Sequence, residues 1–557
     1  MGSSRVLALV AIATTIIACG SDAPPPTGPI TAAITHYDVT FDLVTRHASA
    51  TLTARVDTGG DCLALPFRAT DLADVTIDGA PASGTLTADT LTVCGTGYEA
   101  GAELAIHAAM NVPLAVLAGS QVGYSETAAP GGNTLYYLIS WIEGCDRFAP
   151  CDHRPSAFAT YAFHVAHPAG VTVLCPGTIT EDAASSTTTC AFDRAGGPTY
   201  STFGLIASAG WQAQPLGAWD GIATTLYEYP GGTVGAKLDQ PFVAGFVGWM
   251  QATFGPYPYG DALRVVAAPT YWSGFEHPGN IVLDNALGGN GSSSYLHPAT
   301  HVLTHELAHQ WAGDQTTLTG TYDFVWKEAM AEYLAFVYEA EHDPPAGDRT
   351  AQAWRNLAIG ASYYPVPGEH PALFTYYGDA YGPGPMVLFR QLESLASRDQ
   401  VIAALKTLLG REHAIGVDDV QAALEATTGL DLAAYFAAWV RGTGAPVWPT
   451  ISASFTPGTG GAGTLAISQT NLTQAAGKGC ACDVALRGAA GEDVRVPVDT
   501  LRDGPAQTLP VTGVAFAVTS TIVDPDARCL VYPATAAARA ARGDHAIAPA
   551  DRPRGAW

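Results

Sequence analysis

Positive charge is scarce in this chain of 557 residues. Lysine and arginine together number 26, against 51 aspartate and glutamate residues, and the formal net charge at pH 7 is −25. Only four of the basic residues are lysines, and they lie far apart in the sequence, at Lys237, Lys327, Lys406 and Lys478. A nucleic-acid partner requires a basic footprint, and anionic lipid surfaces attract basic segments. The composition therefore argues against both kinds of partner.

Charged residues of either sign are also few, at 14%, whereas apolar residues make up 48% of the chain. This composition is typical of globular proteins and excludes a largely disordered chain. A chain of this length is expected to form roughly two to four domains with large cores.

Long apolar runs are missing beyond the N-terminus, so no later segment is apolar enough to span a bilayer. At the N-terminus, Arg5 precedes a short apolar run over residues 6–18, which ends in Ile-Ala-Cys at Cys19. This box resembles the cleavage site of bacterial lipoproteins, and it implies a signal peptide over 1–18 and a lipid on Cys19. A plain secretory signal is the alternative. Residues 19–30 are expected to form a flexible tether, and the chain is expected to be exported, either periplasmic or at the cell surface.

Ten cysteines are compatible with an exported protein in an oxidising compartment. Pairing between near neighbours predicts the disulfides Cys62–Cys94, Cys145–Cys151 and Cys175–Cys190. Cys529 is expected to pair with Cys480 or Cys482, which leaves one cysteine over once Cys19 carries a lipid.

The hydrophobic period changes twice along the chain and predicts a multidomain α+β protein. Residues 31–212 alternate in short runs separated by turns, and in 34–44 one face collects Thr35, Tyr37, Val39, Phe41 and Leu43, so an N-terminal all-β domain is expected. From residue 235 to about 440 a helical period dominates. Residues 448–533 return to short strands and predict a small β-sandwich, and residues 534–557 are expected to be disordered. Helices are expected at 237–254, 297–312, 324–340, 349–363, 385–397, 399–409, 417–427 and 432–440.

The sequence His-Glu-Leu-Ala-His over residues 305–309 predicts a metal site. His305 and His309 lie four apart, on one face of a helix and about 6 Å apart along its axis, so both imidazoles can reach one zinc ion. His301 is also four residues from His305, but it is about 12 Å along the axis from His309, too far to share the ion. We therefore expect His301 to pack near the site rather than to bind the metal.

Glu328 follows His309 after the 18 residues 310–327, a gap long enough for one helix to end and a second to return. It is the expected third ligand, and water would take the fourth position. Three protein ligands and one open position are typical of catalytic rather than structural zinc. One zinc ion per chain is expected, with Glu306 beside it to take a proton from the bound water. Glu332, one turn after Glu328, can support a ligand or can face solvent.

These motifs resemble the zinc aminopeptidases of the aminopeptidase N and leukotriene hydrolase family. The zinc pattern is preceded by Phe-Gly-Pro-Tyr-Pro-Tyr over 254–259 and by Ser-Gly-Phe-Glu-His over 273–277, which resembles the Gly-Ala-Met-Glu-Asn signature of the family's exopeptidases. It is followed by Tyr-Gly-Pro-Gly over 381–384. The resemblance covers about residues 31–450, and it implies a thermolysin-like α+β catalytic domain over 213–447. Residues 140–143 hold no counterpart of the family's substrate-binding glutamine.

The resemblance also implies residue roles. Glu306 is expected to act as the general base, and Tyr381 to donate a hydrogen bond to the oxyanion that develops at the scissile carbonyl. Glu276 is expected to bind the free α-ammonium of the substrate, next to Gly274 and Phe275. Tyr376 and Tyr377 are close in sequence to Tyr381 and compete with it for its role.

The expected function is therefore a zinc-dependent aminopeptidase that removes N-terminal residues, neutral or basic, from short peptides in a cleft between the first two domains. One alternative is a zinc endopeptidase that uses the same chemistry, because Ser273, Phe275 and His277 depart from the signature. Another is a lipoprotein that binds peptides without cleaving them. An epoxide-hydrolase side activity is a weaker option.

Overall fold

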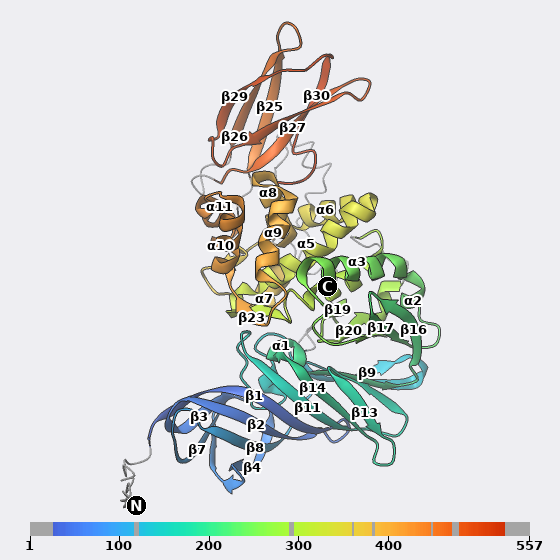
Figure 1. Ribbon diagram of the computed structural model, residues 1–557, viewed down its shortest axis with the longest axis vertical. Helices are drawn as coiled ribbons and strands as arrows, with labels where there is room; N and C mark the ends of the chain where they lie inside the picture. The colour runs from blue at the N-terminus through green and yellow to red at the C-terminus, as the bar shows by residue number, and fades with distance from the viewer. Residues whose placement is uncertain are drawn as a thin grey trace, which may run out of the picture.

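A computed structural model describes residues 26–115, 122–288, 295–358, 361–380, 385–446, 449–470 and 478–529. Figure 1 shows a β-rich part in blue to teal, a mostly helical middle part in green to orange, and a pair of small sheets in orange-red at the far end. The multidomain α+β architecture is thus confirmed. Among the described residues, no helix is both long and apolar enough to cross a membrane. The expected signal peptide, Cys19 and the tail over 534–557 lie outside the described residues.

The N-terminal part contains an 11-stranded sheet, whose main path runs β13-β14-β11-β1-β2-β8-β4-β5, and a four-stranded sheet in the order β12-β15-β10-β9. The strands are β1 (Pro29–Asp42), β2 (His47–Thr58), β3 (Gly60–Pro66), β4 (Thr70–Ile77), β5 (Ala80–Pro81), β6 (Ser83–Leu86), β7 (Thr90–Tyr98), β8 (Glu103–Asn111), β9 (Gly123–Ala129), β10 (Asn133–Ile139), β11 (Phe158–Ala166), β12 (Val171–Leu174), β13 (Thr178–Asp182), β14 (Thr187–Pro198) and β15 (Gly204–Ala209). A single helical turn, α1 (Thr199–Thr202), joins β14 to β15.

Strand β1 shows how the alternating pattern forms a core face. Tyr37, Val39, Phe41 and Leu43 are all buried, as the alternation predicts. Thr35 is the exception, because the pairing of β1 with β2 shifts register between Ile34 and His36. A residue inserted at such a bulge leaves the alternation, so Ile34 rather than Thr35 enters the core. The strand begins at Pro29, inside the segment expected to be a tether.

A five-stranded sheet opens the middle part, in the order β16-β17-β18-β20-β19. Its strands are β16 (Gln212–Trp219), β17 (Ile222–Glu228), β18 (Ala262–Ala268), β19 (Gly274–Phe275) and β20 (Asn280–Asp284). Strands β17, β18 and β20 run parallel, whereas the short edge strand β19 pairs antiparallel with β20. This edge strand carries Gly274 and Phe275 of the signature toward the helices.

Most expected helices are present with ends moved by a few residues. They are α3 (Gln240–Phe254), α4 (Pro298–His309), α5 (Phe324–His342), α8 (Pro385–Leu395), α9 (Arg398–Leu408), α10 (Val417–Thr428) and α11 (Ala433–Trp439). Helix α6 (Pro344–Ala358) begins five residues before the predicted 349, because proline is favoured in the first turn of a helix. Helices α2 (Val234–Lys237) and α7 (Leu373–Ala380) were not predicted.

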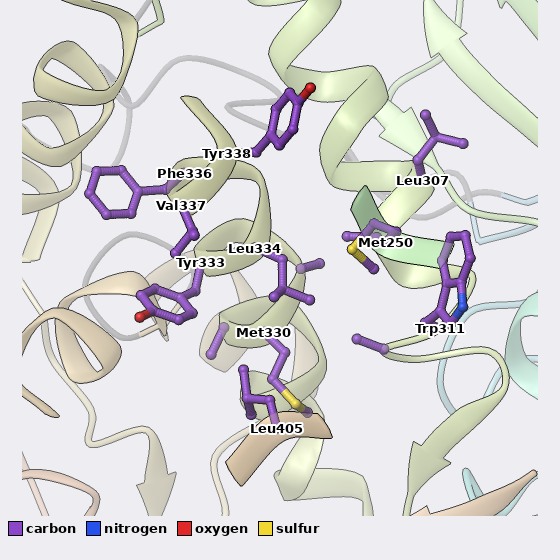
Figure 2. Packing of buried hydrophobic residues seen from close by; sticks show 14 of the residues in the cluster. Met250, Leu307, Trp311, Met330, Tyr333, Leu334, Phe336, Val337, Tyr338 and Leu405 are labelled. Atoms are coloured by element: carbon purple, nitrogen blue, oxygen red, sulfur yellow. The ribbon is translucent and has the colours of Figure 1, made fainter. Parts of the chain in front are cut away.

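The helices of the middle part enclose one apolar core. Figure 2 shows Met250 of α3 and Leu307 of α4 close to Trp311, with Met330 and Leu334 of α5 and Leu405 of α9 nearby. Leu307, Trp311 and Leu334 are fully buried. The two helices that carry the metal motif are therefore held against each other by apolar packing, which fixes the distance between their polar faces.

The C-terminal part consists of two three-stranded sheets packed over a small core. One sheet contains β25 (Thr450–Pro457), β26 (Gly463–Thr470) and β29 (Ala506–Val511), and the other contains β27 (Ala481–Gly488), β28 (Asp493–Asp499) and β30 (Val518–Val523). The predicted disulfides Cys62–Cys94, Cys145–Cys151 and Cys175–Cys190 are confirmed, and Cys529 pairs with Cys480. Disulfides of this kind are typical of proteins outside the cytoplasm.

Candidate metal centre

Helices α4 and α5 bring the expected ligands together. His305 and His309 project from one face of α4, and Glu328 projects from the first turns of α5. All three side chains are buried. Because α4 ends at His309 and the chain returns through a short strand, β21 (Thr316–Leu318), the second helix can place its carboxylate against the first.

The three ligand atoms form a compact triangle. His305 Nε2 and His309 Nε2 are 3.0 Å apart, and Glu328 Oε2 is 3.4 Å from the former and 3.2 Å from the latter. Ligands at the corners of a tetrahedron around zinc lie roughly 3.3 Å apart, given bonds of about 2.0–2.1 Å. The triangle therefore has the size that a zinc ion requires, with one coordination position left open.

Contacts behind the ligands orient both imidazole rings. His305 Nδ1 lies 2.7 Å from Glu332 Oε2, and His309 Nδ1 lies 3.0 Å from the carbonyl oxygen of Ala312. A neutral ring that donates from Nδ1 presents an unprotonated Nε2, which is the form that binds a metal. Burial lowers the pKa of His305, but hydrogen bonds to Glu328 and Glu332 raise it to about 10, so a bound ion must displace a proton there.

His301 lies outside the triangle. Its Nδ1 is 2.7 Å from Glu339 Oε1 and its Nε2 is 3.1 Å from Glu332 Oε1. Glu332 is buried and also accepts from the indole of Trp354, so it supports the metal ligands instead of facing solvent. His301 and Glu332 therefore both lie behind the metal ligands, where Glu332 contacts His305 and His301 contacts Glu332.

Glu306 and β19 meet at the mouth of the site. One ligand-capable atom each of His305, Glu306 and His309 lie within 4.8 Å of one another. A Cβ atom on Gly274 would collide with Glu306 Oε1, so a larger residue at this point of the edge strand would require the Glu306 side chain to move. Burial raises the pKa of Glu306 to about 8; the charge of His305 opposes this, and the carboxylates of Glu276 and Glu328 add to it.

Glu276 is fixed by a side chain that follows the metal motif. The amide nitrogen of Gln310 donates to the backbone oxygen of Glu276 at 3.0 Å and to Asp314 Oδ2 at 3.1 Å. The amide oxygen of Gln310 accepts from the backbone nitrogen of Gly279 at 2.9 Å. Gln310 therefore ties the signature loop to α4, and the metal motif gave no signal of this role.

Lys327 is a site residue that the sequence analysis did not select. Its Nζ lies 2.5 Å from Glu276 Oε1 and 2.9 Å from Glu328 Oε1. Burial alone would raise the pKa of Glu328, but Lys327 and His309 hold it well below its usual range. The only signal in the sequence was the rarity of lysine in this chain.

Aromatic side chains line the pocket beside the metal ligands. Trp141, Trp272, Phe275 and Tyr377 all contribute to it. The ring of Trp141 lies 5.2 Å from that of Tyr377 and 6.2 Å from that of Trp272. Trp141 has a φ of 48°, a conformation that bulky residues rarely adopt. It occupies the segment where the family's glutamine was not found.

Two of the three candidate tyrosines lie in the described residues, and they have different environments. Tyr377 lines the pocket, whereas the hydroxyl of Tyr376 is buried and donates to the carbonyl oxygen of Pro365. Tyr381 lies outside the described residues.

The N-terminal part closes the site from one side. Ser201 Oγ donates to Asp314 Oδ1 at 2.6 Å, and Tyr200 Oη donates to the carbonyl oxygen of Gly313 at 2.7 Å. His277 Nδ1 donates to the carbonyl oxygen of Ser201 at 2.5 Å, and burial lowers the pKa of His277 to about 4. His277 therefore joins the two parts as a neutral donor and is not among the residues that line the pocket.

The comparison with protein families identifies this arrangement. Residues 244–363, which span both helices and the signature, match the model for the peptidase family M1 domain. Over this segment the chain is similar to the M1 peptidases. The zinc site formed by His305, His309 and Glu328 is typical of M1 peptidases.

Two curated relatives carry the name aminopeptidase N. The one from Streptomyces lividans is 27% identical over 160 residues, which cover 26% of this chain and 18% of the relative. The one from Acetobacter pasteurianus is 24% identical over 218 residues, which cover 37% of this chain and 60% of the relative. The matched segments span less than two thirds of either relative.

Solved structures share the fold. Legionella pneumophila aminopeptidase A in complex with aspartic acid matches with a TM-score of 0.71 and 16% identity, over 92% of this chain and 60% of that chain. A mutant M1 zinc metallopeptidase from Deinococcus radiodurans, bound to a Tyr-Ser-Ala substrate, matches with a TM-score of 0.60 and 21% identity, over 75% of this chain and 96% of that chain. At these identities the likeness shows the fold.

Proposed function

We propose that the protein is a zinc-dependent aminopeptidase that removes single residues from the N-termini of short peptides. The observation that carries the proposal is the buried carboxylate of Glu276, which lines the same pocket as His305, His309, Glu328 and Glu306. A metal position for the scissile carbonyl and a nearby anion for the free amine fix how far the cleaved bond lies from the N-terminus.

The residues around the metal position divide the chemistry among them. Zinc, when bound by His305, His309 and Glu328, lowers the pKa of its water and polarises the carbonyl of the substrate. Glu306 takes the proton of the attacking water and passes it to the leaving amine. Its raised pKa suits this exchange, because a base titrating near neutral pH can both accept and release a proton.

The oxyanion that develops at the carbonyl requires a hydrogen-bond donor. We assign that role to Tyr381, on its resemblance to the family tyrosine, and we place Tyr377 in the wall of the pocket. Gly274 and Phe275 form the edge strand that receives the peptide backbone, next to the amine position.

The first side chain of the substrate faces aromatic surface. Trp141, Trp272 and Tyr377 give the pocket an apolar wall, and aromatic faces of this kind favour neutral apolar side chains. The proposed substrates are therefore short peptides with a neutral, preferably large, N-terminal residue. Folded proteins are excluded, because their termini do not reach a buried carboxylate.

We further propose that the protein is an exported lipoprotein anchored through Cys19 at the membrane or cell surface. The lipoprotein-like box before Cys19 and the disulfides support this location.

The alternative is an endopeptidase that uses the same zinc chemistry. A short peptide with an apolar N-terminal residue and its N-acetylated twin separate the two when the products are followed by mass spectrometry. The proposal predicts a ladder of products that lose one residue at a time, from the free peptide only. Internal cleavage of the acetylated twin would refute it, and no cleavage of either peptide would favour a peptide-binding protein.

A further inference from the structure

A buried ammonium group already occupies the carboxylate that the substrate amine is proposed to use. Lys327 Nζ lies 2.5 Å from Glu276 Oε1, and only 3% of the lysine side chain is exposed. Burying a charged group in this way is unfavourable unless it is paired, so Lys327 and Glu276 each depend on an opposite charge nearby. A substrate ammonium must therefore share Glu276 with Lys327.

The surrounding structure is shaped to hold this lysine. Gly313, at a φ of 144°, lies against the lysine stem, and a Cβ atom there would be 2.9 Å from Lys327 Cγ and 3.0 Å from Lys327 Cε. The ring of Tyr200 lies 5.4 Å from Nζ and offers a cation–π contact. The same ammonium contacts Glu328 Oε1 at 2.9 Å, on the side of the carboxylate away from the two histidines.

The charges around Glu276 show how Lys327 affects the binding of a substrate ammonium. Lys327 brings one positive charge into contact with both Glu276 and Glu328. A substrate ammonium at Glu276 would meet this like charge, whereas a neutral residue at position 327 would remove it. Lys327 is thus an internal competitor for Glu276.

We propose that Lys327 is a specificity-determining residue that weakens binding of the substrate's free amine and so reduces the preference for free over N-blocked ligands. This inference deepens the proposed aminopeptidase function and rests on the role given there to Glu276. It concerns the ion pair between Lys327 and Glu276 and does not require either group to titrate.

The test compares two zinc-binding probes, leucine hydroxamate and N-acetyl-leucine hydroxamate, on zinc-loaded wild type and Lys327→Gln by titration calorimetry. We expect the variant to bind the free-amine probe about 10- to 100-fold more tightly, because one opposing charge is removed a few ångströms from the amine. The acetylated probe should bind both proteins equally. Lys406→Gln, which removes an exposed lysine on α9, is the matched control and should behave as wild type.

Equal tightening for both probes, or weaker binding of the free-amine probe alone, would overturn the inference. Zinc content and thermal unfolding of each variant check that the site is intact. If Lys327→Gln loses zinc, Glu276→Gln gives a second test in which Lys327 remains. The inference then predicts that the acetylated probe binds better than the free amine, whereas equal binding of both probes would contradict it. A failure of the proposed aminopeptidase function would show in a different experiment, because the wild-type protein would then cleave no free-amine substrate.

Discussion

Glu332 holds His305 in the orientation that faces the metal, and Glu332→Gln tests this directly. The Glu332 carboxylate accepts from His305 Nδ1 at 2.7 Å and from His301 Nε2 at 3.1 Å, and only 1% of its side chain is exposed. The substitution keeps the shape but removes the charge. The amide oxygen that replaces the carboxylate accepts from the Nδ1–H of His305 more weakly, so the ring is held less firmly with its unprotonated Nε2 toward the metal.

The magnitude follows from the kind of bond that is lost. A hydrogen bond between an imidazole and a buried carboxylate is charge-assisted and contributes about 1.5–3 kcal/mol. Removing such a partner of a metal ligand weakens metal binding by about 10- to 100-fold, or about 1.4–2.7 kcal/mol. The zinc dissociation constant, measured by competition with a chelator, should therefore rise by that factor.

Glu339→Gln is the matched control, because it makes the same change two turns further along α5. Glu339 contacts His301 at 2.7 Å and Thr350 at 2.9 Å, so it lies one residue further from the zinc ligand. The control should lose less zinc affinity than Glu332→Gln. Wild-type zinc affinity in Glu332→Gln, or an equal loss in both variants, would refute the role given to Glu332.

Three further predictions concern the chemistry and the junction between the parts. Glu306→Gln should lower kcat by about 10²- to 10⁴-fold while zinc content stays at one ion per chain; loss of the zinc would contradict a role limited to proton transfer. Tyr381→Phe should lower kcat by about 10²- to 10³-fold with Tyr377→Phe close to wild type, and the reverse result would move the oxyanion role to Tyr377. His277 has a folded-state pKa of about 4 against 6.5 when unfolded, so its unfolded form binds a proton first as the pH falls. Stability should therefore drop by about 3 kcal/mol between pH 6.5 and pH 4, and denaturant unfolding of His277→Asn should show a smaller drop; an equal drop would exclude His277 as its source.

Periodicity predicted the architecture well where an element buries one face. The alternation in β1 and the four-residue spacing of His305 and His309 follow directly from backbone geometry. Two features departed from the prediction: a bulge excludes Thr35 from the core, and the short helix α7 was not predicted. Neither the bulge nor this short helix leaves a strong pattern in the apolar residues of the sequence.

The metal ligands were predicted because they lie close in sequence or at a spacing that two adjacent helices require. Lys327 and Gln310 were missed, although each is next to a selected residue. Their roles depend on contacts with the loop around Glu276, which is distant in sequence, and no local spacing encodes such a contact. Trp141 was found only as a departure from the family pattern, because its place beside Trp272 depends on how two parts of the chain pack.

The central claim is that zinc and Glu276 together make an exopeptidase that requires a free amine. The most direct measurement is the hydrolysis of an aminoacyl reporter amide and its N-acetylated twin by protein that starts after Cys19, with zinc, with chelator, and after zinc is restored. The account predicts hydrolysis of the free-amine reporter only, lost with the chelator and recovered with zinc. Equal or preferred hydrolysis of the acetylated twin, or hydrolysis that survives removal of zinc, would contradict it.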